Sequence, residues 1–199
     1  MPPHENMSRS EENILVAKSL AGDAAAYAGL VDAFSAPVFS LLLRLLGNHA
    51  DSEDAAQEVF MRAYKSLSTY NPKYPFLPWI LAIAHNRAMD VLKSRKSELV
   101  SINDPETPVE IEDPVRMSEQ FERDFETGEL WQAVATLPPL YQEALMLRHR
   151  QDLKYSEISV IMELPLGTVK TMLFRARQML KTMALSGKLK LFEPNDGIS

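Results

Sequence analysis

The stretch Tyr155–Lys181 reads YSEISVIMELPLGTVKTMLFRARQMLK and indicates the fold. A short helical segment, a turn containing Pro165 and Gly167, and a second helix follow one another, which is the pattern of a helix-turn-helix. Along the second helix, apolar residues recur at i, i+4, i+7 and i+11 and form one narrow stripe. We predict that this stripe is the buried face of the helix: Val169, Leu173, Ala176 and Leu180.

The opposite side of this helix is basic and rich in hydrogen-bonding groups, and it carries no acidic residue. Such a face suits the major groove of DNA, where base edges and flanking phosphates are reached together. The residues that we expect to contact DNA are Thr168, Lys170, Thr171, Phe174, Arg175, Arg177 and Lys181. The alternative is an ordinary amphipathic helix whose basic face is solvated.

Helical periodicity extends over most of the chain, and no segment alternates as a strand does. One unit is expected from Glu12 to about Arg95, with breaks at Gly22-Asp23 and Pro37, a helix start at Asp51-Ser52, and a further helix from Pro78. A second set of helices is expected over 120–136, 138–148, 155–162 and 167–183. We therefore predict an all-α protein of two small domains joined by an acidic flexible linker. The predicted segments are a disordered 1–11, a domain at 12–96, a linker at 97–118, a helix-turn-helix domain at 119–185 and a tail at 186–199.

Composition excludes several classes of protein. The chain has 199 residues and no cysteine, which excludes a disulfide scaffold and any thiolate metal site or nucleophile. Its four histidines are scattered, and its seven glycines form no phosphate-binding loop. We expect no catalytic residues, no metal and no cofactor. We also expect a cytoplasmic protein without membrane insertion, because we find neither a signal peptide nor an apolar run of about 18 residues.

Charge is distributed unevenly along the chain. The net charge is −6, yet residues 98–129 alone carry −9, and residues 165–191 carry +6 with no acid. A second basic cluster consists of Arg87, Lys93, Arg95 and Lys96. The binding of a charged partner follows the local electrostatic field rather than the net charge of the whole chain. The sequence therefore predicts two basic surfaces separated by an acidic connector.

An aromatic segment precedes the second basic cluster. Tyr70, Tyr74, Phe76 and Trp79 fall within ten residues, and Lys73 lies among them. Aromatic rings beside cations suit the stacking of unpaired nucleotides, and an amide such as Asn86 can read a base edge. The alternative is that Phe76 and Trp79 are core anchors, and for Tyr70 both interpretations stay open.

A different surface is expected on the acidic helix that follows residue 51. Its carboxylates, amide and aromatic ring lie on adjacent turns and would repel DNA, so they form a candidate protein-docking face: Asp54, Gln57, Glu58 and Phe60. The alternative is a solvated acidic face with an i,i+4 ion pair between Glu58 and Arg62.

Three segments together resemble the bacterial extracytoplasmic-function sigma factors of the sigma-70 family. They are DSEDAAQEVFMRAYKSL (51–67), YNPKYPFLPWILAIAHNRAMDVLKSR (70–95) and LPPLYQEALMLRHRQDLKYSEISVIMELPLGTVKTMLFRARQMLK (137–181). The resemblance covers about Glu12 to Lys181 and implies two helical domains, sigma-2 and sigma-4. This chain departs from the family at Met172 and His85, where the family usually has arginine.

The resemblance also implies a set of partners. The acidic helix would dock on the clamp helices of the β′ subunit of core RNA polymerase, and the sigma-4 domain would bind the β flap. The helix from Lys170 to Arg177 would read the −35 element of promoter DNA, and the linker would thread toward the active-site cleft. An anti-sigma factor would occlude the polymerase-binding surfaces.

For the −10 element, the resemblance implies that the stretch from Tyr70 to Arg95 melts the DNA and holds it. Tyr70 and Asn86 align with the walls of a pocket for one flipped base. The residues assigned to this element are Tyr70, Trp79, His85, Asn86, Arg87, Lys93 and Arg95.

Two other functions compete with this interpretation. A stand-alone helix-turn-helix repressor would need neither the aromatic segment nor the acidic docking helix. A helical hydrolase would need convergent carboxylates or histidines, whereas the acids here cluster in the Pro-rich connector.

Overall fold

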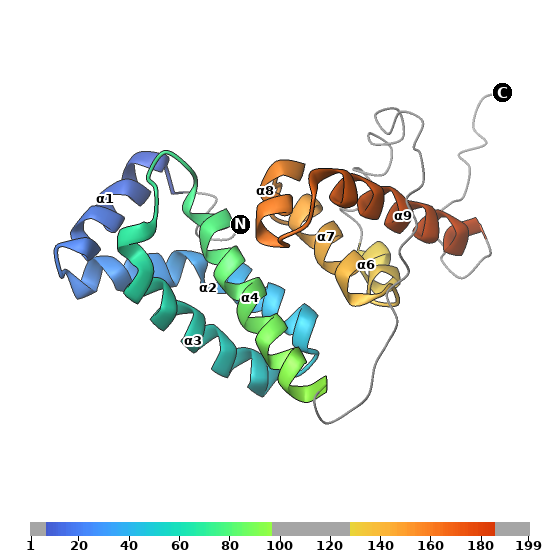
Figure 1. Cartoon of the computed structure of the whole chain (residues 1–199), viewed down its shortest axis with the longest axis horizontal. Helices are drawn as coiled ribbons and strands as arrows, with labels where there is room; N and C mark the ends of the chain where they lie inside the picture. Colours follow the sequence, from blue (N-terminus) through green and yellow to red (C-terminus); the bar gives the residue numbers. More distant parts are fainter. Residues whose placement is uncertain (1–6, 97–127, 186–199) are drawn as a thin grey trace. The chain divides into compact units, whose positions relative to one another are not determined.

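The computed structural model describes residues 7–96 and 128–185. These residues form helices without a strand, so the prediction of an all-α protein is confirmed. Two compact units are present, the first formed mainly by residues 7–96 and the second mainly by residues 128–185 (Figure 1). The linker itself, the tail and part of the predicted N-terminal segment lie outside the described residues, and the exact domain boundaries stay a prediction.

The first unit consists of α1 (Arg9–Leu20), α2 (Ala24–Leu46), α3 (His49–Ser66), the short 3₁₀ helix η2 (Leu67–Thr69) and α4 (Phe76–Lys96). Helix α2 packs against α1, α3 and α4, and α3 also packs against α4. The largest fully buried side chains of this unit come from these elements: Leu30, Leu41, Leu42, Leu67, Phe76, Ile80 and Leu81. The central position of α2 explains why it is apolar around most of its circumference.

Local hydrogen bonds set the helix starts and move two of them from the expected positions. Helix α1 begins at Arg9 rather than Glu12, because the side chains of Ser8 and Glu11 form a reciprocal capping box. Helix α3 begins at His49 rather than Asp51, because Asn48 is the N-cap and accepts from the Asp51 amide. The expected break at Pro37 is wrong, since α2 continues through this buried proline while packing on three neighbouring helices.

Helix α2 also bears on the expectation that no segment could span a membrane. It is long and apolar enough to do so by length and composition, with a mean hydropathy of 1.6 over its most apolar window. Length and mean hydropathy alone are weak evidence for a membrane span, because the core helix of a folded domain passes the same test. Half of the window is buried inside the first unit, as in the core helix of a folded domain.

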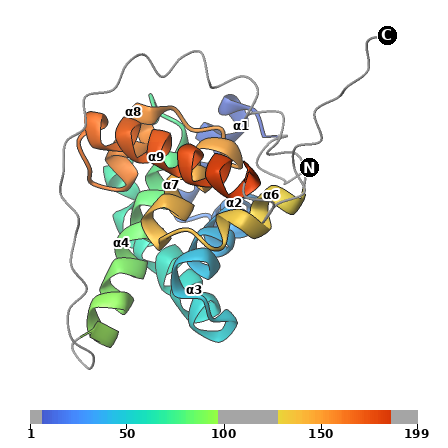
Figure 2. The same ribbon diagram turned by 90° about the vertical axis from the view of Figure 1, so that its right-hand side faces the viewer.

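The second unit consists of α6 (Gly128–Val134), α7 (Pro139–His149), α8 (Tyr155–Ile161) and α9 (Leu166–Leu185). Helix α9 packs on α7 and α6, as Figure 2 shows. The predicted stripe of α9 is confirmed, because every member is at most 1% exposed: Val169, Leu173, Ala176 and Leu180. The periodicity of the sequence thus located the buried face of this helix correctly.

The turn between α8 and α9 is built differently from the expectation. Glu163 adopts a left-handed conformation with φ of 53°, and the amides of Glu163 and Leu164 donate to Val160 O and Ser159 O. This pair of bonds is a Schellman motif, in which glycine usually occupies the position held by Glu163. Gly167, expected in the turn, lies inside the first turn of α9.

Candidate nucleic-acid interface

The face of α9 opposite its buried stripe is accessible. Thr168, Lys170 and Lys181 are exposed, and Arg175 is partly exposed. Thr171 and Phe174 are also partly exposed, and the Thr171 hydroxyl donates to Gly167 O at 2.9 Å. Cationic and hydroxyl groups therefore line one side of a helix that is held rigidly from the other side, which is the arrangement required for a groove-reading helix.

Arg177 is the exception among the residues assigned to this face. It is only 3% exposed, and its guanidinium donates to the Tyr155 hydroxyl at 3.3 Å. Its position next to Ala176 turns it toward the core, so it connects α9 to α8. The structure contradicts the prediction that Arg177 contacts DNA.

The aromatic segment before α4 divides into buried and exposed rings. The ring centroid of Tyr70 lies 5.3 Å from that of Phe76 and 5.5 Å from that of Trp79. Tyr70 is only 6% exposed. Burial raises the pKa of Tyr70, although the Arg9 guanidinium beside its hydroxyl opposes the shift. Phe76 is fully buried and Trp79 is partly buried, so these rings pack as core anchors. The Tyr70 ring is therefore buried in the core and not presented to a base, which does not fit its assignment to a pocket wall.

The loop between η2 and α4 presents a different aromatic ring. Tyr74 is 66% exposed, and Asn71, Lys73 and Pro75 are exposed beside it. The Asn71 side chain accepts from the Lys73 amide at 3.0 Å and tightens this turn. An exposed ring next to a cation suits base stacking better than the buried Tyr70 does. The sequence showed Tyr74 within the aromatic cluster but could not distinguish it from its buried neighbours.

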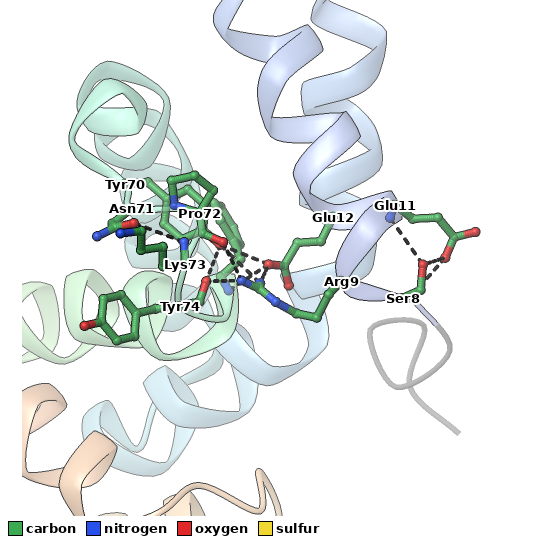
Figure 3. Close-up of polar contacts among 10 residues, drawn as sticks. Ser8, Arg9, Glu11, Glu12, Tyr70, Asn71, Pro72, Lys73 and Tyr74 are labelled. Carbon is green, nitrogen blue, oxygen red and sulfur yellow. Dashed lines mark hydrogen bonds and ion pairs between the residues drawn. The ribbon is translucent and has the colours of Figure 1, made fainter.

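The backbone of this loop is held by two residues of α1. The Arg9 guanidinium donates to the carbonyls of Pro72, at 2.9 Å, and Tyr74. Glu12 accepts from the Tyr70 hydroxyl at 3.0 Å and from the Phe76 amide at 3.1 Å, and it pairs with Arg9 (Figure 3). Sequence reasoning missed both residues, because about sixty positions separate them from the loop and neither belongs to a local motif.

The polar residues of α4 differ widely in accessibility. His85 is 5% exposed, so the prediction that it contacts DNA is contradicted by its burial in the core. Asn86 and Lys93 are exposed on the same helix. Arg87 and Arg95 form ion pairs with Glu58 and Asp51 of α3, and Arg95 also donates to Leu46 O.

The residues predicted to form a docking face lie on helix α3. Asp54 and Gln57 are exposed, while Glu58 is paired with Arg87 at 2.8 Å and with Arg62 at 3.7 Å. The ion pair foreseen in the alternative interpretation is thus present. Phe60 is partly buried, and Met61 is 56% exposed on the next turn after Gln57. Met61 was missed as a candidate because its side of the helix could not be fixed from periodicity alone.

The position of this face depends on a tyrosine from α2. The Tyr27 hydroxyl donates to Phe60 O, and the Tyr27 ring meets the exposed ring of Tyr64 edge-on with centroids 4.8 Å apart. Burial raises the pKa of Tyr27 to about 12, so it stays a hydrogen-bond donor at neutral pH. Helix α3 is therefore fixed from its inner side while its outer side remains accessible.

Comparison with known families assigns both units. The model described as "Sigma-70 region 2" matches residues 30–98, and the model described as "Sigma-70, region 4" matches residues 127–180. The ECF RNA polymerase sigma factor SigM of Bacillus subtilis is 34% identical over 148 residues, which cover 73% of this chain and 87% of SigM. The chain belongs to the extracytoplasmic-function sigma factors of the sigma-70 family. Region 2 of this sigma factor corresponds to the first unit and region 4 to the second.

Solved structures support the fold of this sigma factor. The structure of CnrH in complex with the cytosolic domain of CnrY has a TM-score of 0.59, 20% identity, and coverage of 88% of this chain and 98% of that chain. The sigma factor RpoE from Bartonella quintana, in complex with the anti-sigma factor NepR, has a TM-score of 0.55, 19% identity, and coverage of 75% and 90%. Within the described parts of this sigma factor, no group of three acidic or histidine residues could hold a metal ion.

Proposed function

We propose that this sigma factor binds core RNA polymerase, recognises the −35 and −10 elements of its promoters and opens the DNA for initiation. It acts as a specificity subunit and not as a catalyst, in the bacterial cytoplasm where the polymerase works. The observation that carries the proposal is the accessible face of α9, which offers cationic and hydroxyl groups opposite a fully buried apolar stripe. Family membership supports the same conclusion for the second unit.

For the −35 element, we propose that α9 lies in the major groove. Arg175 would contact a base edge, and Lys170 and Lys181 would contact phosphates, since a lysine acts as a point charge and an arginine as a bidentate donor. Arg177 has no part in this contact because it is buried.

For the −10 element, we propose that the exposed Tyr74 and Asn86 contact the unpaired non-template strand. Extruding a base costs a few kcal/mol, and stacking on an aromatic ring returns about 1–3 kcal/mol. One exposed ring and one amide can therefore decide whether the open state persists.

For the polymerase, we propose that the outer face of α3 docks on the β′ clamp helices and that the second unit binds the β flap. Asp54, Gln57 and Met61 provide acidic, amide and apolar groups on adjacent turns of that face. We further propose that an anti-sigma factor covers these surfaces in this sigma factor, and the existence of a complex between Bartonella quintana RpoE and the anti-sigma factor NepR supports this proposal.

Run-off transcription tests the proposal. Purified chain is added to core RNA polymerase on fragments of genomic DNA from the bacterium that encodes it. Discrete transcripts should appear only with both components, and the DNA upstream of their start sites should share two sequence elements. Arg175→Ala should lose transcripts while keeping polymerase binding. Transcripts that are identical with and without the chain would contradict the proposal.

A further inference from the structure

Helix α4 begins without a capping residue of its own. It starts at Phe76 after Pro75, and its first residues are Phe, Leu, Pro and Trp, none of which has a side-chain oxygen. The first backbone amides of a helix have no partner inside the helix, and a buried one needs an acceptor from elsewhere. The Phe76 amide finds it in Glu12 of α1, whose carboxylate is 64 positions earlier in the chain and 3.1 Å away.

Glu12 is suited to this role by charge as well as by position. A carboxylate is favourable at the positive end of a helix dipole, and a bond from an amide to a charged oxygen is stronger than a neutral one. The residue itself is only 7% exposed, so its charge needs partners, and Arg9 and the Tyr70 hydroxyl supply them. Glu12 therefore caps α4 from a different helix.

Arg9 fastens the preceding loop in the same way. Its guanidinium donates to Pro72 O and Tyr74 O and also to the Tyr70 hydroxyl at 3.2 Å. Figure 3 shows Arg9 and Glu12 reaching the loop side by side from α1. The single hydrogen of the Tyr70 hydroxyl is within reach of two acceptors, Glu12 Oε1 at 3.0 Å and Tyr74 O at 2.6 Å, so it can be donated to the cap or to the loop.

We propose that Arg9 and Glu12, here called the α1 brace, are positioning residues for promoter opening. This inference rests on the proposed function of the loop that carries Tyr74. Ordering a free loop of several residues costs more than one stacking contact returns, so a base-trapping loop must be ordered before DNA arrives. The α1 brace provides this order through the backbone and leaves the ring of Tyr74 exposed.

Hydrogen exchange tests the brace without any DNA. The exchange rate of the Phe76 amide is measured by NMR in the free full-length chain. Glu12→Ala should raise it by at least about tenfold, because a bond to a charged acceptor is lost. Glu12→Gln should give a smaller rise, since its amide oxygen can still accept. Lys18→Ala, an exposed change on the same helix, should leave it unchanged. An unchanged rate in Glu12→Ala would overturn the proposal.

Promoter opening tests the positioning role. Permanganate reactivity of −10 thymines is measured with core polymerase on a duplex promoter and on the same template pre-melted at the −10 element. Arg9→Ala removes a partly exposed side chain and should keep polymerase binding, but it should lower opening of the duplex roughly tenfold. If Glu12→Ala loses the placement of the loop rather than the fold, the pre-melted template should restore most of its permanganate reactivity.

The outcomes separate the inference from the function on which it rests. If the unmodified chain fails to open the duplex, the proposed function fails, while hydrogen exchange still reports on the brace. If the unmodified chain opens the duplex and Arg9→Ala and Glu12→Ala do so equally well, the function stands and the positioning role is overturned. Loss of polymerase binding in both variants would also overturn it, because the brace would then serve the fold as a whole.

Discussion

Two arginines on α9, two positions apart, are expected to behave differently. Arg177 is buried and bonded to Tyr155, so Arg177→Ala should lower the free energy of unfolding by about 1–3 kcal/mol, as measured by urea denaturation. Arg175 is partly exposed on the DNA-facing side, so Arg175→Ala should leave stability within about 0.5 kcal/mol. It should instead cost about 1–3 kcal/mol of discrimination at one −35 base pair. Equal loss of stability in both variants would contradict this assignment of faces.

Glu163 stores strain in the turn of the helix-turn-helix. Its φ of 53° is a conformation that a residue with a Cβ rarely adopts and that glycine adopts freely. Glu163→Gly should therefore stabilise the second unit, by about 0.5–1 kcal/mol, despite the entropy that glycine adds to the unfolded chain. Thermal denaturation should show a higher Tm for this variant. A lower Tm would mean that the Glu163 side chain contributes more than its backbone costs.

Helix α3 carries the proposed polymerase contact on its outer face. Met61 is 56% exposed and lies one turn after Gln57. Met61→Ala should weaken binding of core polymerase by at least about 1 kcal/mol without lowering the Tm, because an exposed side chain contributes little to folding. Ile14→Ala on α1 is the matched control, since Ile14 is also an apolar side chain that is half exposed. Equal affinities of the two variants would remove α3 from the interface.

The buried faces of the helices could be predicted from the sequence where neighbours lie on one side only. The stripe of α9 was correct in every member because that helix packs on α7 and α6 and is otherwise accessible. The helical periodicity from Glu12 onward predicts that Ile14 and Leu20 face inward, but on α1 they are 50% and 53% exposed. A short helix with few apolar residues does not reveal which of them face the core.

On α3 the buried face agrees with the sequence only in part. The apolar spacing after residue 51 predicts a buried face of Ala56, Phe60, Ala63 and Leu67. Ala63 and Leu67 are buried, whereas Ala56 and Phe60 are only partly buried and their neighbours Ala55 and Val59 are buried instead. Small side chains give a weak periodic signal, and Ser52 is buried because its hydroxyl bonds to Asn48 O. Local spacing cannot show such contacts in advance.

The candidate site was predicted as a region better than as a set of residues. The aromatic segment and α9 both present accessible side chains, as expected for a site, whereas Tyr70, His85 and Arg177 are buried. Polar residues can be buried when a partner satisfies them, and the partner of Tyr70 is Glu12, 58 positions away. Pairs so distant in sequence are decided by tertiary packing.

At the scale of the whole molecule, the charge distribution explains why DNA binding should depend on the polymerase. The basic residues of α9 and α4 belong to a chain of net charge −6, of which residues 98–129 contribute −9. The long-range field of the free chain therefore does not favour DNA, although its local faces do. Core polymerase would hold α9 and α4 at the spacing of the −35 and −10 elements, so that both would contact the promoter at the same time.

Permanganate reactivity of a duplex promoter tests this account most directly. The −10 thymines are probed with the chain alone, with core polymerase alone and with both together, at physiological salt. The account predicts reactive thymines only with both components, because opening needs the polymerase as well as the loop that presents Tyr74. Thymines that stay unreactive with both components, on a template that yields transcripts when it is pre-melted, would contradict the claim that this sigma factor opens promoter DNA.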